Sequence, residues 1–274
     1  MTDVSHYQKY QVGGMKTLNS FLTEKLHLNK GMHVYNYRPE SVEELRSLVQ
    51  KLLKERGNDA NLNDIDVSNV TSFFSNKQRL GLFERLQIGN IDISLWDVSN
   101  VTDMRDAFYG CSRFNCNLSN WKVDNVRNMR EMFYGCSSFN TNFSNWNVDK
   151  VSNMQNMFGG CSNFTGDGVD NWNVSEVINM GGTFLYCEKF NANLKNWNVS
   201  KVTNFGGMFF GCKEFNSELD NWNVSKGTEF SSMFRDCLKF TANLDKWKVK
   251  DIAETLYMFS GSPLENNPPK WYHA

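Results

Sequence analysis

The sequence predicts an α/β solenoid, in which the chain winds as a right-handed coil of short parallel strands and short helical turns behind an N-terminal helical cap. Three observations carry this prediction. A unit of 25 residues, once lengthened to 26, recurs along most of the 274-residue chain. The apolar residues of the unit return at the same positions each time, and an amphipathic helical pattern precedes the first unit. Repeats of this length indicate stacked units that bury a continuous core between neighbours.

The N-terminal segment is predicted to span residues 1–57 and to contain a capping helix. Ser41 and Glu44 form a capping box in front of an apolar stripe, and Gly57 ends the pattern. Such a helix can lay its apolar face on the open first coil. A weaker periodic segment at 15–28 is interpreted as a second helix.

The repeat solenoid is predicted at 58–262, followed by a C-terminal cap at 263–274. A degenerate first unit occupies 58–95, and about seven units of 25 residues follow it. The extra length of the first unit predicts an inserted loop or helical turn between Lys77 and Leu86. In the cap, Trp271 and Tyr272 are expected to act as a lid.

Each full unit opens on a tryptophan, and in six of them a cysteine and then a phenylalanine follow in the second half. The short W-x-V stretch reads as a strand, and the M-x-x-M-F stretch has the i, i+3, i+4 spacing of one or two helical turns. A 25-residue unit is too short for a helix pair and fits a leucine-rich-repeat-like coil. The predicted structural ladders are Trp96, Trp121, Trp146, Trp172, Trp197, Trp222 and Trp247, and Cys111, Cys136, Cys161, Cys187, Cys212 and Cys237.

The cysteine and asparagine columns are interpreted as structural. Stacked thiols would lie about 4.8 Å apart with parallel Cβ vectors, which does not suit a disulfide, so buried reduced thiols are expected. Asparagine recurs four residues after the cysteine, as at Asn115 and Asn140, and its amide is expected to bond backbone from one coil to the next. The tryptophans share strand parity with valine, which favours the core over a ligand platform.

Composition narrows the function. A net charge of −1 gives no reason to expect a nucleic acid or an anionic membrane as partner. No apolar run is long enough for a transmembrane helix, and the four histidines lie outside the repeats, away from the cysteine column. No phosphate-binding loop or metalloprotease motif occurs, so neither an enzyme nor a cofactor is predicted.

The unit WDVSNVTDMRDAFYGCSRFNCNLSN, with its copies over roughly residues 36–262, resembles the BspA-type leucine-rich-repeat surface proteins, which include a mycoplasma repeat family of unknown function. This resemblance implies an extracellular or surface-exposed binding array, used in adhesion or host contact, without catalytic residues. The chain shows no visible signal peptide or anchor, and free cysteines suit an intracellular setting. Localisation therefore stays open between the two.

If the repeated columns form the core, function must use the variable positions. One variable strip lies between the two methionine positions, and a second follows the cysteine; both are expected to face solvent and to contact a partner. The candidate residues are Arg105, Asp106, Arg130, Glu131, Gln155 and Asn156 in the first strip, and Arg113, Lys189, Glu214 and Lys239 in the second.

The predicted function is a non-catalytic protein-interaction module, in first place for adhesion or host contact. One alternative is an intracellular or virion-associated scaffold, which includes self-association through the ends of the solenoid. Another is a carbohydrate-binding or polysaccharide-acting β-solenoid. The expected partner is accordingly a protein, with a glycan as the alternative.

Overall fold

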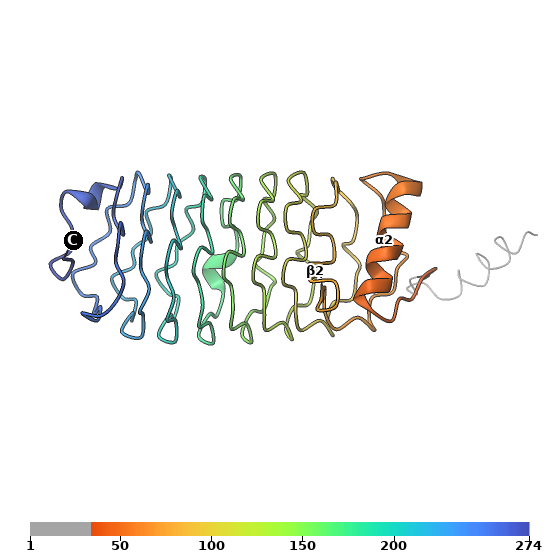
Figure 1. The fold of residues 1–274 in the computed structure, drawn as a ribbon, viewed down its shortest axis with the longest axis horizontal. Helices are drawn as coiled ribbons and strands as arrows, with labels where there is room; N and C mark the ends of the chain where they lie inside the picture. The colour runs from red at the N-terminus through yellow and green to blue at the C-terminus, as the bar shows by residue number, and fades with distance from the viewer. Residues whose placement is uncertain (1–33, 274) are drawn as a thin grey trace, which may run out of the picture. The chain divides into compact units, whose positions relative to one another are not determined.

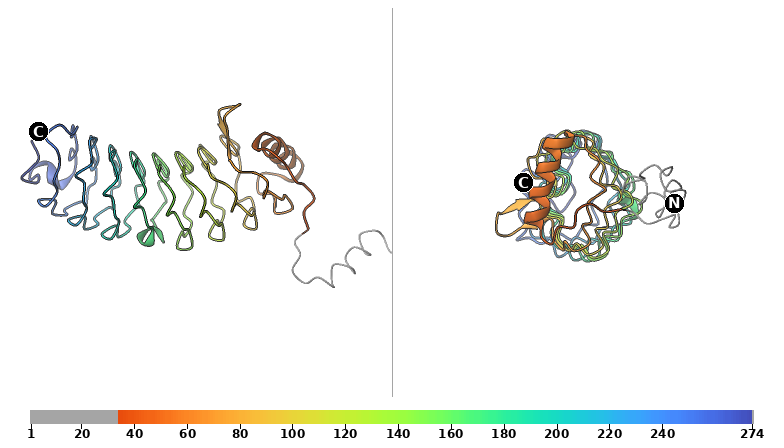
Figure 2. Two further views of the ribbon diagram at one scale, coloured as in Figure 1. Left: turned by 90° about the horizontal axis from the view of Figure 1, so that it is seen from below. Right: turned by 90° about the vertical axis from the view of Figure 1, so that its right-hand side faces the viewer.

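The computed structural model describes residues 34–273, and the predicted helix at 15–28 lies outside them. The chain separates into two compact units, Met1–Tyr35 and Asn36–Ala274, and the second is described below. In this unit the chain winds through successive coils that lie side by side (Figure 1). Seen end-on, the coils superpose around a common interior (Figure 2).

Helix α2, Val42–Arg56, covers the first coils. The Ser41 side chain accepts a hydrogen bond from the Glu44 N–H, and the Glu44 carboxylate accepts one from the Glu40 N–H. Val42, Leu45, Val49 and Leu52 are buried against the coils, so the helix belongs to the same compact unit. The compact unit that contains the coils therefore begins at Asn36 and includes this helix.

In the full units, parallel pairing between coils occurs at one position of the repeat, and it is not the W-x-V stretch predicted as a strand. The isolated parallel bridges run from Ser72 to Asp103 and onward through Asn128, Asn153, Asn179, Asn204, Glu229 and Glu254. This position lies seven residues after the tryptophan. The polypeptide makes a turn directly after W-x-V, and the residue that pairs with the neighbouring coil lies beyond this turn.

The M-x-x-M-F stretch contains no helix, which corrects the prediction of helical turns. In the described part of the chain, the helices are α2 and two short 3₁₀ helices, Val169–Asn171 and Pro263–Glu265. Instead, alternate N–H groups donate to the following coil: Met104 to the Asn128 carbonyl at 2.9 Å, Asp106 to that of Arg130 at 3.0 Å and Phe108 to that of Met132 at 2.8 Å. We call this segment of each coil the turn ladder.

Left-handed backbone explains why the turn ladder is not helical. Asp106, Glu131, Asn156, Ser232 and Tyr257 occupy equivalent positions and all have φ between 53° and 57°. In two further coils the same position holds Gly182 and Gly207. A left-handed residue in every coil redirects the next N–H out of the coil and towards its neighbour, because a continuous right-handed helix cannot pass through that conformation.

Two irregular segments interrupt the repeat. The insertion predicted at Lys77–Leu86 includes most of a small antiparallel hairpin, in which β1, Phe74–Ser75, pairs with β2, Leu80–Gly81. The extra residue of the 26-residue unit lies at Gly168, which has φ 87° and precedes the 3₁₀ helix Val169–Asn171. A Cβ atom at Gly168 would lie 2.3 Å from the Ser144 nitrogen, so only glycine fits there.

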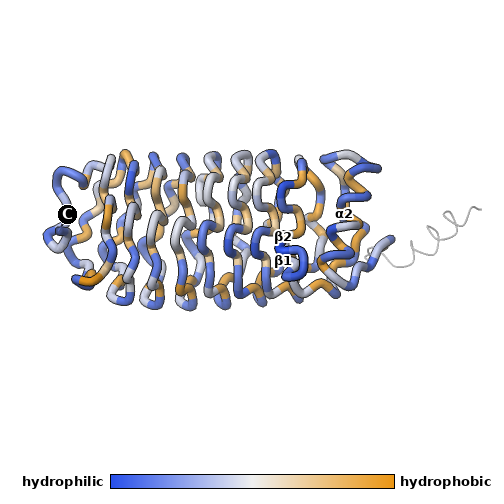
Figure 3. The backbone as a smooth tube through the Cα atoms, viewed as in Figure 1, coloured by the Kyte–Doolittle hydropathy of each residue, from blue (hydrophilic) through white to orange (hydrophobic). Residues whose placement is uncertain are grey.

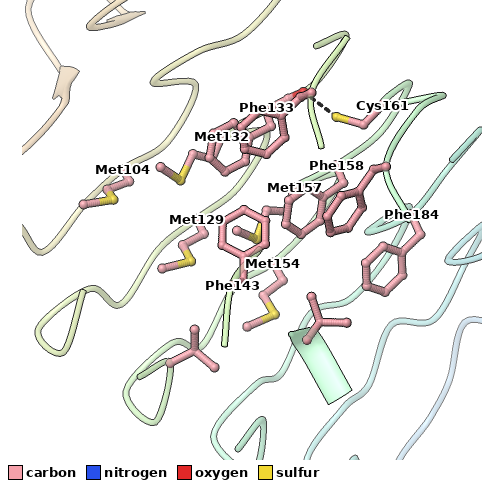
Figure 4. Packing of buried hydrophobic residues seen from close by; sticks show 14 of the residues in the cluster. Met104, Met129, Met132, Phe133, Phe143, Met154, Met157, Phe158, Cys161 and Phe184 are labelled. Atoms are coloured by element: carbon pink, nitrogen blue, oxygen red, sulfur yellow. Dashed lines mark hydrogen bonds between the residues drawn. The ribbon is translucent and has the colours of Figure 1, made fainter. Parts of the chain in front are cut away.

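The core is a set of stacked side-chain columns. All seven predicted ladder tryptophans are at most 5% exposed, and consecutive indole rings lie 6.3–6.5 Å apart where they stack. The phenylalanine column runs beside them, with Phe133 and Phe158 stacked at 5.6 Å (Figure 4). Apolar and polar residues alternate around each coil (Figure 3), so each coil buries its apolar side chains only when its neighbours are present.

Two of the columns also bond the previous coil. The Trp121 Nε1 donates to the Ile93 carbonyl at 3.0 Å, and the equivalent bond recurs at each later tryptophan. The Cys161 thiol lies 3.1 Å from the Phe133 carbonyl (Figure 4), and its counterparts repeat this contact. Each of these carbonyls also accepts a backbone N–H of its own coil, as Phe133 does from Cys136, so the tryptophan and cysteine side chains add a second hydrogen bond that joins neighbouring coils.

Asparagine side chains fix the outer turns. The Asn115 Oδ1 accepts from the Asn140 N–H at 2.9 Å, and Asn140 in turn accepts from Thr165. At the bridge position, the Oδ1 atoms of Asn128 and Asn153 accept from the N–H two residues later in their own coil. The first set joins neighbouring coils, and the second stabilises the turn that begins the ladder.

The C-terminal residues cover part of the last coil. Trp271 continues the tryptophan column: its ring lies 6.2 Å from Trp247, and its Nε1 donates to the Leu244 carbonyl at 2.8 Å. The Tyr272 ring packs edge-on against Phe259 at 5.0 Å. These two residues close the aromatic columns at this end of the stack.

Candidate functional site

A partly exposed row of aromatic and arginine side chains follows the outer side of the turn ladder, with Arg85 and Tyr186 its most exposed members. We call it the aromatic strip, and it consists of Arg85, Tyr109, Tyr134, Tyr186, Phe210 and Arg235. The Tyr109 and Tyr134 rings stack at 5.1 Å, and the Arg85 guanidinium lies 5.8 Å from the Tyr109 ring centre. Each contact joins neighbouring coils, and the coil that holds Gly159 separates the Tyr134 half of the strip from the Tyr186 half.

The second half of the strip has the same composition. The Tyr186 and Phe210 rings lie 4.7 Å apart, and the Arg235 guanidinium lies 5.1 Å from the Phe210 ring and 5.7 Å from that of Tyr257. Tyr186 is 48% exposed. The strip therefore begins and ends on a cation held over an aromatic ring.

Glycines make room for these rings. A Cβ atom at Gly159 would lie 2.7 Å from the Tyr134 ring, and one at Gly211 would lie 2.5 Å from the Tyr186 ring. The tyrosine side chains therefore rest directly on the backbone of the next coil, which restricts their motion. A rigid aromatic surface loses little conformational entropy when a partner binds.

The sequence did not single out the strip, because its members do not share one repeat position. Tyr109, Tyr134, Phe210 and Arg235 lie two residues before a cysteine, whereas Tyr186 lies directly before one. The available signal was the aromatic residue two positions before Cys111, Cys136 and Cys212. The position two residues before the cysteine also holds Gly159 and Leu185, so its residue type is not constant from unit to unit.

Most residues of the first strip predicted from the sequence are only partly exposed, and Arg130 is the exposed one. The Arg105 guanidinium lies 2.8 Å from the Asp103 carboxylate and 4.2 Å from the Phe74 ring centre, and Arg130 forms an ion pair with Glu131 at 2.8 Å. Gln155 accepts a hydrogen bond from Asn179. Asn156 is also half-buried. Residues in the turn ladder lie close to the next coil, so their side chains fold back onto it.

Asp106 is the most perturbed residue of that strip. Its Oδ1 is buried without a hydrogen-bond partner among the described residues. Burial, together with the nearby carboxylates of Glu131 and Glu84, raises the pKa of the Asp106 carboxyl to about 6. The carboxyl group therefore carries an energetic cost when it is ionised at neutral pH.

The second predicted strip lies at the surface, and its charges are arranged between coils. Arg113 is exposed, and the Lys189 ammonium donates to the Asn163 side chain at 2.6 Å. Lys239 pairs with Glu214 in the preceding coil. Exposed pairs of this kind contribute little to stability, and both partners remain accessible.

The structure gives no sign of a metal or redox centre in residues 34–273. No group of three or more histidine, cysteine and acidic side chains gathers there in a way that could hold a metal ion. The seven cysteines are free and buried, and burial raises the pKa of the Cys161 and Cys187 thiols well above the usual value. Thiols in this state are poor nucleophiles.

None of the helices in the described part of the chain combines the length and apolar character needed to span a bilayer. Searches among curated proteins and among solved structures each found no match. One family model does match, over residues 77–168 and again over 161–271, and it is described as "Mycoplasma protein of unknown function, DUF285". The two matches together cover most of the coils, including the whole aromatic strip. The chain therefore belongs to this family of repeat proteins of unknown function.

Proposed function

We propose that this chain is a non-catalytic protein-binding module and that the aromatic strip is its contact surface. The observation that carries the proposal is the pairing of partly exposed tyrosine and phenylalanine rings with arginines on a rigid backbone. Tyrosine and arginine are enriched among the residues that dominate binding energy at protein interfaces. The strip replaces Arg105, Asp106, Arg130 and Glu131 as the first candidate surface.

Our proposal also includes the type of fold and the setting in which the module works. We infer a leucine-rich-repeat-like solenoid of the BspA type, for which the 25-residue period and the bridges between successive coils are the support. A binding array of this kind suits adhesion or host contact, and it equally suits an intracellular or virion-associated scaffold. The two settings use the same surface and differ in the partner.

The test compares two variants that change aromatic or apolar side chains at the surface, of which Phe210 is partly exposed. A Tyr186→Ser, Phe210→Ser double variant removes the centre of the strip, and Leu238→Ser removes an off-strip side chain that is 57% exposed. Proteins captured by the immobilised wild-type chain should be captured by the Leu238→Ser chain and lost from the double variant by about tenfold or more. Equal capture by all three chains would remove the strip as the binding surface.

A glycan is the second candidate partner, because exposed aromatic rings also stack on sugar rings. Tyr186 offers such a ring. Defined oligosaccharides titrated against the wild type and the double variant distinguish the two. Saturable binding that is lost in the double variant would favour the glycan over the protein.

A further inference from the structure

The two ends of the turn ladder differ chemically. Within each coil its N–H groups point to the following coil, and its carbonyls accept from the preceding one, as in Phe209 N–H to the Met233 carbonyl and Phe234 N–H to that of Met258. The stack must therefore end in unpaired carbonyls at its N-terminal side and unpaired N–H groups at its C-terminal side.

The N-terminal carbonyls already have a donor. The Arg46 guanidinium, from α2, donates to the Leu82 carbonyl at 2.7 Å and to that of Glu84 at 3.1 Å, and it also bonds Gly81. This arginine takes the place of the N–H groups of a preceding coil. The acceptor end is therefore closed.

The donor end is closed only in part. We call it the C-terminal edge, formed by the N–H groups of Thr255, Tyr257, Phe259 and Gly261. The Glu265 carboxylate accepts from Gly261 at 3.0 Å, and the Tyr272 ring packs against Phe259. No acceptor among the described residues bonds the N–H of Thr255 or Tyr257.

The open part of the edge borders a cleft. The cleft has a volume of about 550 Å³, and Thr255, Leu256, Tyr257 and Tyr272 are among its lining residues. Leu256 is 61% exposed and Tyr257 is 56% exposed. Trp271 and Tyr272 cover the aromatic columns of the last coil, and the Tyr272 hydroxyl donates to the Thr255 carbonyl at 3.5 Å, but Leu256 and Tyr257 stay exposed.

We propose that the C-terminal edge binds a polypeptide segment from another protein, which adds one more rung to the turn ladder. Its backbone carbonyls accept from Thr255 and Tyr257, and an apolar side chain covers Leu256. The support is continuity with the coil–coil contacts, since the equivalent N–H groups of every earlier full unit bond backbone carbonyls. The mode corresponds to strand addition at an open sheet edge.

The same polarity argues against a second folded copy as the occupant. Two C-terminal edges would bring N–H groups against N–H groups, with no acceptor between them. A head-to-tail contact needs the carbonyls that Arg46 already binds. Self-association through the ends, one of the expectations from the sequence, is therefore disfavoured at both ends.

A peptide with the sequence of residues 228–236, acetylated and amidated, is a suitable probe, because this stretch carries the carbonyls that the preceding coil uses. Amide exchange is followed by NMR on the full chain. Saturating peptide should slow exchange at Thr255 and Tyr257 by about tenfold or more and leave Ser232, which is already bonded, unchanged. A scrambled peptide should have no effect.

Leu256→Asp should weaken peptide binding by about tenfold, whereas Leu238→Asp, a change at an equally exposed leucine outside the edge, should leave it unchanged. Three results would overturn the proposal. These are absence of protection at millimolar peptide, the same protection by acetate alone (which would indicate a carboxylate site), and dimerisation of the wild type that Leu256→Asp abolishes. None of these outcomes bears on the aromatic strip.

Discussion

At the scale of single residues, two features disfavour aspartate at position 106. Its carboxylate is partly buried near other carboxylates, and its backbone is left-handed. Asp106→Asn removes the buried charge and keeps a side chain that tolerates φ 53°, as Asn156 does in the equivalent position. Because the carboxyl is only half-buried, we expect about 1–2 kcal/mol of stabilisation at pH 7.

The pH dependence tests the cause. The folded pKa of Asp106, about 6, lies above the unfolded value, so the folded chain binds the extra proton between pH 4 and 6. The stability gained by Asp106→Asn should therefore be present above pH 6 and disappear near pH 4. Urea unfolding of both proteins at pH 4.5, 6 and 7.5 measures it, and a pH-independent gain would assign the effect to the backbone.

The cysteine column gives a second prediction at this scale. Burial raises the pKa of the Cys136, Cys161, Cys187 and Cys212 thiols, so the folded chain keeps protons that the unfolded chain loses above pH 9. Stability should fall as pH rises, by roughly 1 kcal/mol per thiol at pH 9.5. In Cys187→Ala, the loss of stability between neutral pH and pH 9.5 should be smaller by the contribution of one thiol. Identical losses in the two proteins would exclude the thiols as the cause.

At the scale of elements, α2 contributes through one side chain as well as through its apolar face. Arg46→Met should destabilise the chain by about 2–3 kcal/mol, because the carbonyls of Leu82 and Glu84 lose their donor in a part-buried site. Lys51→Met, on the exposed side of the same helix, is the matched control. Chemical unfolding compares them, and equal stabilities would mean that water replaces the guanidinium.

The left-handed position of the turn ladder restricts which residues can occupy it. Gly207→Val should cost about 1–2 kcal/mol, because φ is 60° and a β-branched residue strains this conformation, although the space around the site is open. Gly207→Asn should cost less. Thermal unfolding of both variants measures the two losses of stability. Equal losses would show that the removal of glycine, and not the strain of a β-branched side chain, causes them.

Much of the core and of the capping helix could be predicted from sequence, and the local conformation of the coils could not. The columns of Trp121, Cys161 and their equivalents follow from strict spacing alone. The spacing of Met129, Met132 and Phe133 satisfies a helical face equally well, and only the left-handed Glu131 between them shows otherwise. Glutamate rarely adopts that conformation, so no residue-level signal marked it. The aromatic strip could not be predicted either, because its rings come from different positions of the repeat.

At the scale of the whole molecule, the constant register of the coils should permit shortening. Deletion of residues 198–222 joins Trp197 to Asn223 with the columns in register, and it leaves α2 and the Trp271 lid unchanged. We expect a folded and somewhat less stable chain, since each coil contributes an interface. Deletion of 198–220 is the control, because it shifts every later column. Native-like tryptophan fluorescence in both proteins, or in neither, would contradict this account.

The one-way hydrogen bonding of the turn ladder also has an electrical consequence. Peptide groups that all point in the same direction add their dipoles, as they do along a helix, so the stack should be positive at Tyr257 and negative near Gly81. Arg46 and Glu265 carry the charges that neutralise those two poles. Removal of either side chain should therefore leave one end of a chain of near-zero net charge with an unbalanced partial charge.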